Sequence, residues 1–167
     1  MNLRIKFLPA VALMLLAGCA PFRWTSVTIG EPEPEVIAKL GNPTHHYQAG
    51  SDHLLEYMHG PMGQVTYMAR IDAQGRLVSY EQVLTTQKFM TIKLGEARKE
   101  DVLRTIGAPS ETAFYTLSQL EAWSYPYKEN GAWDSMMTVY FDRSGVVRKL
   151  ENGPDPRRMP DGRGRHR

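Results

Sequence analysis

The chain of 167 residues has a single cysteine, Cys19, so no disulfide bond can form within one molecule. It also lacks an apolar run long enough to cross a membrane. The stretch from Phe7 to Leu16 contains Pro9 and reaches about half of the ~20 residues that a spanning helix needs. A nucleophile motif and a glycine-rich phosphate loop are missing as well. We therefore expect a protein that is not an enzyme and needs no cofactor.

Histidine and carboxylate residues have no spacing that specifies a metal site. The densest group lies between residues 45 and 59, but it does not follow the Cys-x-x-Cys or His-Glu-x-x-His patterns of closed sites. We predict no metal site and interpret the group as solvated polar positions, with weak adventitious binding as the alternative. Its members are His45, His46, Asp52, His53, Glu56 and His59.

The first 18 residues predict a cleaved signal peptide. Arg4 and Lys6 precede the short apolar run, and Leu16-Ala17-Gly18 stands directly before Cys19. A small-residue pair before a cysteine resembles the bacterial lipobox, which implies cleavage before Cys19, a diacylglyceryl group on its thiol and an acyl chain on its amine. The alternative is an ordinary secretory signal whose site abuts a cysteine. Two or more acyl chains anchor stably, so the lipobox implies lasting membrane attachment through Cys19.

The residue after the cysteine indicates which membrane a lipoprotein is sorted to. It is Ala20, where lipoproteins kept at the inner membrane typically carry Asp, so the lipobox resemblance implies the periplasmic face of the outer membrane. Removing 18 of 167 residues leaves 149, in which 18 acidic residues face 18 basic ones because Arg4 and Lys6 are lost. That length suits one compact domain or two small ones that share a core. Nucleic acid is excluded as a partner by compartment.

Residues 153–167 predict a basic disordered tail. They consist mainly of Pro, Gly, Arg and Asp with almost no apolar side chains, so they cannot bury enough surface to become ordered. Such a tail could contact anionic lipid, lipopolysaccharide phosphates or an acidic partner. The alternative is a solvated tail without a partner.

The chain between residues 29 and 152 contains an internal repeat. Leu40-Gly41-Asn42-Pro43 returns 66 residues later as Ile106-Gly107-Ala108-Pro109, and Tyr57 matches Trp123 at the same spacing. An Asp-x-x-Gly motif at 72–75 returns at 142–145, a spacing of 70. One duplication with a four-residue insertion between the first and second strands explains the spacings. We place a tether at 19–28, repeat 1 at 29–84 and repeat 2 at 85–152.

Each repeat begins with a short predicted helix. Gly41 and Gly107 suit the left-handed residue just past a helix end, and the proline two residues later prevents continuation. Apolar residues at i, i+1 and i+4 form one stripe in each helix, namely Val36, Ile37 and Leu40, then Val102, Leu103 and Ile106. Residues 85–91 predict a further short helix between the repeats.

Three strands follow each helix in the prediction, at 53–59, 65–71 and 77–83, and at 120–127, 136–141 and 146–150. His45 and His46 fall in the loop before the first strand. Asp-x-x-Gly joins the second and third strands as a hairpin with Gly at positive φ. The fold class is therefore α+β, with two tandem α-β-β-β repeats that pack together because one repeat has too little core alone.

These motifs carry a family resemblance. Two copies of a helix with Val, (Leu/Ile)-Gly-x-Pro, an aromatic strand and Asp-x-x-Gly, all behind a lipobox, resemble the SmpA/OmlA (BamE-like) outer-membrane lipoproteins over residues 28–152. BamE is similar to one such unit, and secreted β-lactamase inhibitory proteins are similar to a tandem pair. The resemblance implies an anchored, non-catalytic interaction or scaffold module in outer-membrane assembly or envelope integrity. The alternative is a periplasmic inhibitor or ligand-binding module.

Aromatic residues are the candidates for partner binding. Trp123 and Tyr125 alternate along one predicted strand, so they lie either in the core or in one exposed patch, and Tyr57 lies on the corresponding strand of repeat 1. Trp133 differs, because it lies in the inserted loop 128–134 after the turn-forming Asn130-Gly131. We predict that Trp133 is an exposed anchor for an envelope protein, with the outer-membrane assembly machinery as one candidate.

Overall fold

The computed structural model describes residues 26–60 and 63–158, in which the same order of elements occurs twice. α2 (Thr86–Phe89) lies between the two repeats, as the sequence predicts. Repeat 1 contains α1 (Glu33–Leu40), β1 (His45–Ala49), β2 (Asp52–His59), β3 (Val65–Ile71) and β4 (Leu77–Gln82). Repeat 2 contains α3 (Lys99–Ile106), β5 (Glu111–Tyr115), β6 (Leu120–Glu129), β7 (Trp133–Phe141) and β8 (Val147–Pro154). The α+β class and the two-repeat arrangement are confirmed.

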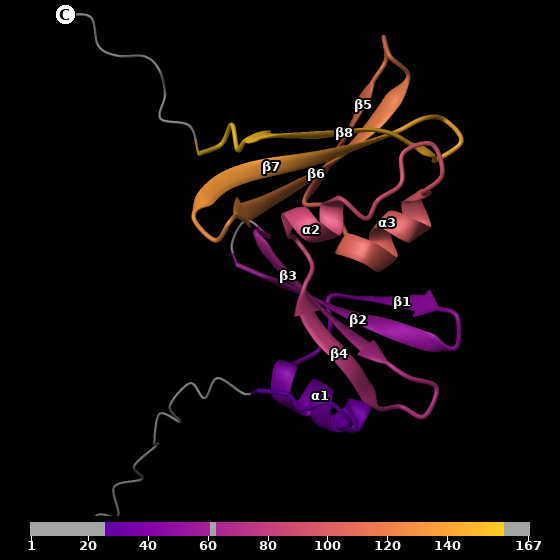
Figure 1. The fold of residues 1–167 in the computed structure, drawn as a ribbon, viewed down its shortest axis with the longest axis vertical. Coiled ribbons are helices and arrows are strands. Elements are labelled where there is room, and N and C mark those ends of the chain that lie inside the picture. Colours follow the sequence, from indigo (N-terminus) through magenta and orange to yellow (C-terminus); the bar gives the residue numbers. More distant parts are fainter. Residues whose placement is uncertain (1–25, 61–62, 159–167) are drawn as a thin grey trace, which may run out of the picture.

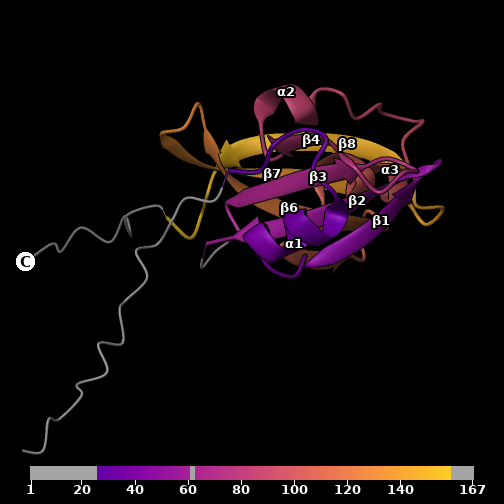
Figure 2. The same cartoon turned by 90° about the horizontal axis from the view of Figure 1, so that it is seen from below.

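The strands form two antiparallel sheets of four, ordered β1-β2-β3-β4 (sheet 1) and β5-β6-β7-β8 (sheet 2). Figure 1 shows the elements stacked in layers: sheet 2, then α2 and α3, then sheet 1, then α1. Figure 2 looks at the stack from the side of α1. Sheet 1 therefore has helices over both faces. Within the described residues, sheet 2 has helices over one face only.

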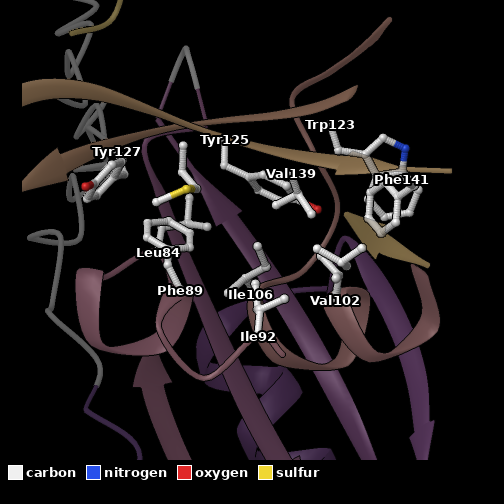
Figure 3. Packing of buried hydrophobic residues seen from close by; sticks show 12 residues of the cluster. Leu84, Phe89, Ile92, Val102, Ile106, Trp123, Tyr125, Tyr127, Val139 and Phe141 are labelled. Atoms are coloured by element: carbon white, nitrogen blue, oxygen red, sulfur yellow. The ribbon is translucent and has the colours of Figure 1, made fainter. Parts of the chain in front are cut away.

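Three clusters of buried apolar side chains hold these layers together. One joins α1 to sheet 1 and includes Val36, Leu55 and Ile71. A second, on the opposite face of sheet 1, contains Leu54, Met68 and Val83. The largest joins α2 and α3 to sheet 2, as Figure 3 shows. Its members are Leu84, Phe89, Ile92, Val102, Ile106, Trp123, Tyr125, Tyr127, Met137, Val139, Phe141 and Val147.

Glycines end both long helices, as predicted. Gly41 has φ 87° and ψ −175°, and Gly107 has φ 82° and ψ −168°. The positive φ is confirmed, but the extended ψ places both residues outside the left-handed helical region that we expected. They occupy a region that is open essentially to glycine alone. Each glycine N–H still donates to a carbonyl of its helix, that of Ile37 or Leu103.

The two Asp-x-x-Gly motifs form the predicted hairpin turns. Asp72 Oδ1 accepts hydrogen bonds from the backbone N–H groups at positions 74 and 76, and Asp142 Oδ1 accepts those at 144 and 146. Gly75 and Gly145 have φ values of 73° and 75°. The aspartate therefore substitutes for backbone partners inside the turn, and the glycine provides the positive φ.

Each sheet has one strand more than the sequence predicted. His45 and His46 lie in β1 and not in a loop, and β5 occupies the same place in repeat 2. Both strands are sheet edges with several exposed residues. An edge strand that is exposed on both sides lacks the alternation of apolar and polar residues by which strands are recognised.

Strand pairing also corrects the alignment of the repeats. The β1–β2 turn contains two residues and the β5–β6 turn contains four, because Ala49 pairs with Asp52 and Tyr115 with Leu120. The four extra residues of repeat 2 are thus divided, two in the β5–β6 turn and two in the β6–β7 hairpin. Tyr57 consequently corresponds to Tyr125 and not to Trp123.

A contact between the helix and the sheet, present in both repeats, supports the corrected alignment. In repeat 1, Glu33 at the start of α1 lies 3.0 Å from Nε2 of His53 on β2. In repeat 2, Lys99 at the start of α3 lies 2.6 Å from Glu121 on β6. Both pairs join the first residue of the helix to the same position of the sheet, with the acidic and basic partners exchanged.

Residues 153–158, which we assigned to a disordered tail, are ordered. β8 extends to Pro154, and Asp155 is 1% exposed although we assigned the whole of 153–167 to a disordered tail. The Asp155 N–H donates to the carbonyl of Asp134 at 2.9 Å, and its carboxylate accepts from the Arg157 guanidinium at 2.9 and 3.0 Å. Strand pairing and a buried ion pair therefore order this segment. Residues 159–167 lie outside the described part of the chain.

Candidate interaction surface

A buried carboxylate lies where repeat 1 meets repeat 2. Glu56, on β2, is 0% exposed, and it faces the end of α3. Its two oxygens accept the backbone N–H of Ala108 at 3.2 and 3.3 Å, and the hydroxyl of Tyr47 donates to Oε2. Nδ1 of His45 lies 3.4 Å from the same oxygen. A buried carboxylate is costly unless such groups compensate for lost water, so these contacts fix how the repeats dock.

Gly107 and Tyr125 complete this junction. A Cβ atom on Gly107 would lie 2.9 Å from the carboxyl carbon of Glu56, and the Tyr125 hydroxyl donates to the Gly107 carbonyl at 3.2 Å. Burial raises the pKa of Tyr125, and electrostatic interactions with Tyr47 and Glu56 raise it further. Burial and the hydrogen bond to Glu56 also raise the pKa of Tyr47. Both hydroxyls therefore stay protonated and serve as structural donors.

The histidines and carboxylates between 45 and 59 do not converge. Strand alternation places His45 and Glu56 on the face of sheet 1 toward repeat 2, and His46 and His53 on the face toward α1. His59 shares the face of His53, whereas Asp52 contacts Arg70 at 3.2 Å. Within 26–60 and 63–158, no three His, Cys, Asp or Glu residues are placed to hold a metal ion.

Three of the four predicted partner-binding residues lie in the core. Trp123, Tyr125 and Tyr57 are 8%, 1% and 3% exposed. Figure 3 shows Trp123 against Phe141, and their ring centroids are 4.7 Å apart. Burial raises the pKa of Tyr57 to about 12, with smaller contributions from Tyr80 and Glu33. Packing explains these three aromatic residues without a partner.

Trp133 is exposed, at 72%. It is the first residue of β7 and pairs with Glu129, so the expected loop 128–134 is mostly strand and the turn comprises residues 130–132. Asn130 and Gly131 have φ values of 50° and 74°, consistent with the predicted turn. Glu129 accepts hydrogen bonds from Ser135 at 2.7 Å and Asn152 at 3.1 Å. Trp133 thus projects from a braced hairpin.

A second exposed apolar group lies on the β5–β6 hairpin, which rises at the top of Figure 1. Phe114 and Tyr115 are 56% and 51% exposed, and Leu117 in the turn is 104% exposed. With Trp133, they make up four of the eight large apolar side chains that are exposed in the described residues. Sequence reasoning missed this group, although the two additional turn residues, correctly placed, would have pointed to it.

A hollow of about 330 Å³ opens beside α3. Its polar groups already have partners, since Asp101 binds the Arg98 N–H and the Arg104 guanidinium, and Lys93 lies 3.5 Å from Glu96. The hollow is therefore a weaker candidate for an interaction site than the exposed apolar side chains of the two hairpins. Its lining consists of Thr91, Ile92, Lys93, Glu96, Ala97, Asp101, Val102 and Thr105.

Cys19, the predicted lipid attachment residue, lies outside the described residues. None of the helices in the described segments is long and apolar enough to span a membrane.

Comparison with known proteins leaves the family open. No protein-family model matches the chain, and no curated protein matches it. Among solved structures, the crystal structure of a DUF4309 family protein (YjgB) from Bacillus subtilis subsp. subtilis str. 168 is similar at 13% sequence identity, over 75% of this chain and 79% of that chain. The TM-score of 0.32 is too low for this likeness to support a shared fold or function.

Proposed function

We propose that this protein is a BamE-like lipoprotein that acts as a non-catalytic interaction module in assembly or integrity of the bacterial envelope. The lipobox before Cys19 supports an anchor at the periplasmic face of the outer membrane. The observation that carries the interaction role is the exposure of Trp133 on the β6–β7 hairpin, with a second exposed apolar group on the β5–β6 hairpin at the other end of β6. Aromatic side chains are enriched at protein interfaces.

Trp133 is the side chain that we assign to the centre of the partner contact. Tryptophan is enriched among the residues that dominate binding energy, and it contributes most when a rigid element holds it. The bonds from Ser135 and Asn152 to Glu129 hold the hairpin from which Trp133 projects. The partner on this proposal is an envelope protein, with the outer-membrane assembly machinery as one candidate.

Trp133→Ala tests the contact. Because Trp133 makes little contact with the core, we expect the variant to melt like the parent while capture of partners from solubilised membranes weakens by ~2 kcal/mol or more. Leu94→Ala is the matched control, since Leu94 is 57% exposed and lies outside sheet 2. Recovery of outer-membrane assembly proteins would support the scaffold role. Recovery of one soluble periplasmic protein would support the inhibitor alternative, and unchanged capture would contradict the contact.

Cys19→Ser tests the anchor. The variant loses the thiol that receives lipid, so we expect it to leave the outer-membrane fraction after cell fractionation. Mass spectrometry of the native protein should find the mature chain beginning at an acylated Cys19. An unmodified Cys19 in the native protein would contradict the anchor and leave the Trp133 contact to be judged separately.

A further inference from the structure

Among the described residues, each sheet has one edge strand that other backbone segments pair with and one that they leave open. β4 and β8 each receive backbone hydrogen bonds from the segment before a helix, Gly30 to Leu77 and Gly95 to Val147, both at 2.8 Å. In the described chain, the backbone of β1 and β5 pairs only with the inner neighbours β2 and β6. Each of these strands therefore presents an open row of N–H and C=O groups.

β5 lacks the features that protect such an edge. β1 carries His45, His46 and Gln48, and α3 packs near it. All five residues of β5 are exposed, and Glu111 at its start is the single charge. It contains no lysine, arginine or proline, the residues that commonly prevent an edge from pairing with another strand. An exposed edge that ends in Phe114 and Tyr115 is thus suited to accept a further strand.

We propose that β5 pairs with β5 of a second copy of this chain, antiparallel and centred on Ala113. In this register Glu111 faces Tyr115 of the other copy, and Thr112 faces Phe114. Like charges do not oppose each other anywhere in the pairing, and Glu111 can accept a hydrogen bond from the opposing tyrosine hydroxyl. When the axis passes through one residue, positions 111, 113 and 115 face one another, and positions 112 and 114 face one another. The outward N–H and C=O groups of the two strands therefore meet, whichever of these two sets points outward.

The self-complementary sequence is the reason for assigning a second copy of the chain. A twofold axis through Ala113 brings a small side chain opposite itself, and it covers both exposed Phe114 side chains with the threonine of the opposing strand. The arrangement is closed, because pairing uses up the β5 edge of both copies and leaves no β5 edge for a third. It does not rest on the proposed anchor or on the Trp133 contact.

Disulfide trapping tests the register. The background is the purified full chain with Cys19→Ser in a non-ionic detergent, so that each introduced cysteine is the sole thiol. Directly opposed residues of an antiparallel pair have Cβ atoms about 4.5–5.5 Å apart, close to disulfide reach. We expect Ala113→Cys to cross-link about tenfold faster than Thr112→Cys or Phe114→Cys alone. A mixture of the last two should form cross-linked heterodimers.

The matched control is His46→Cys, the position of β1 that corresponds to Thr112, which reports collision without pairing. Sedimentation velocity over a concentration series gives a second measurement. Ala113→Glu places two carboxylates opposite each other at the axis, so it should weaken self-association by about tenfold or more while the melting temperature stays near that of the parent.

Three results would overturn the proposal. One is a monomer throughout the series together with Ala113→Cys cross-linking no faster than His46→Cys. Another is fastest cross-linking by Thr112→Cys or Phe114→Cys alone, which would exclude the register centred on Ala113. The third concerns a lipid contact. If Leu117→Lys abolishes binding to phosphatidylglycerol-containing vesicles and the chain remains monomeric, the hairpin contacts lipid and self-pairing is wrong.

Discussion

The two repeats have the same elements but present different surfaces at equivalent positions. On the face of sheet 1 toward repeat 2 lie Leu54, Glu56 and Met68, and strand pairing places Ala122, Ser124 and Thr138 at the corresponding positions of sheet 2. Large apolar groups and one carboxylate are replaced by smaller or neutral ones. Sheet 1 is thus built to receive another repeat, whereas sheet 2 is the outermost layer of the described residues, in the place of a terminal unit of a repeat protein.

The glycines after the two helices differ in the same way. A Cβ atom on Gly41 would have nothing within 4 Å, but one on Gly107 would meet the Glu56 carboxylate. The two equivalent glycines therefore adopt the same backbone conformation but have different neighbours. Gly107 has a close neighbour because repeat 1 packs against it, and within the described residues Gly41 has no such contact with the other repeat.

Replacing these glycines should give the largest effects. Gly41→Val should cost about 1–3 kcal/mol, because a β-branched residue resists the positive φ. Gly107→Val should cost about 3 kcal/mol or more, since its side chain must also displace Glu56. Thermal and urea unfolding of both variants measure the difference. Equal losses would show that the Glu56 contact adds nothing to the backbone strain.

Glu56 and Ser124 provide the next comparison. Glu56→Ala leaves the Ala108 N–H and the Tyr47 hydroxyl without their acceptor in a buried site, so we expect a loss of about 2 kcal/mol. Ser124→Ala, at the corresponding position of the outer sheet, should stay within about 0.5 kcal/mol of the parent. Urea unfolding compares the two variants. A stable Glu56→Ala protein would mean that water replaces the carboxylate at the junction.

Lowering the pH should have the smallest effect on stability, and repeat 2 should lose more stability than repeat 1. The hydrogen bond from the Arg98 N–H is the main cause that lowers the pKa of Asp101. The hydrogen bond from Lys99 is the main cause that lowers the pKa of Glu121. The Ser144 side chain is the main group that lowers the pKa of Asp142. In repeat 1, Lys39 lowers the pKa of Glu31. A carboxyl group whose folded pKa is depressed stabilises the fold fully above its unfolded pKa.

That stabilisation is lost as the pH falls from about 4 through the folded pKa values. These carboxyl side chains are 15% to 49% exposed and remain in contact with solvent, which screens their ion pairs, so the change in stability is small. Amide hydrogen exchange at pH 5 and pH 3 should therefore show a greater loss of protection in β6, β7 and α3 than in β2, β3 and α1. Equal loss in both repeats would contradict this expectation, and Glu121→Gln should reduce the difference.

Local patterns predicted much of the fold. The apolar stripes of the helices, the positive φ of Gly41 and Gly107 and the Asp-x-x-Gly turns depend on neighbours within a few residues, and all are confirmed. β1 and β5 were missed because edge strands need no alternation. Trp123 was aligned with Tyr57 because one of the two insertions lies in a turn whose length the sequence does not reveal.

Glu56 could not be predicted from its neighbours. Its neighbours in the sequence predicted a solvated position on a strand, with weak adventitious metal binding as the alternative. Its burial comes from Gly107 and Ala108, more than 50 residues away, and hence from docking of one repeat on the other. The exposure of Trp133 was a better prediction, since a turn-forming pair directly precedes it, although the residue lies in a strand.

The exchange of acidic and basic residues between the two helix-to-sheet contacts bears on how a duplicated chain avoids folding incorrectly. Two similar helices and two similar sheets allow each helix to dock on the wrong sheet during folding, a common failure of tandem proteins. If α1 docked on sheet 2, Glu33 would face Glu121, and the like charges would repel. In the correct arrangement Glu33 forms a hydrogen bond with His53, and Lys99 forms an ion pair with Glu121. The exchange of acidic and basic residues between these two contacts therefore favours docking of each helix on its own sheet.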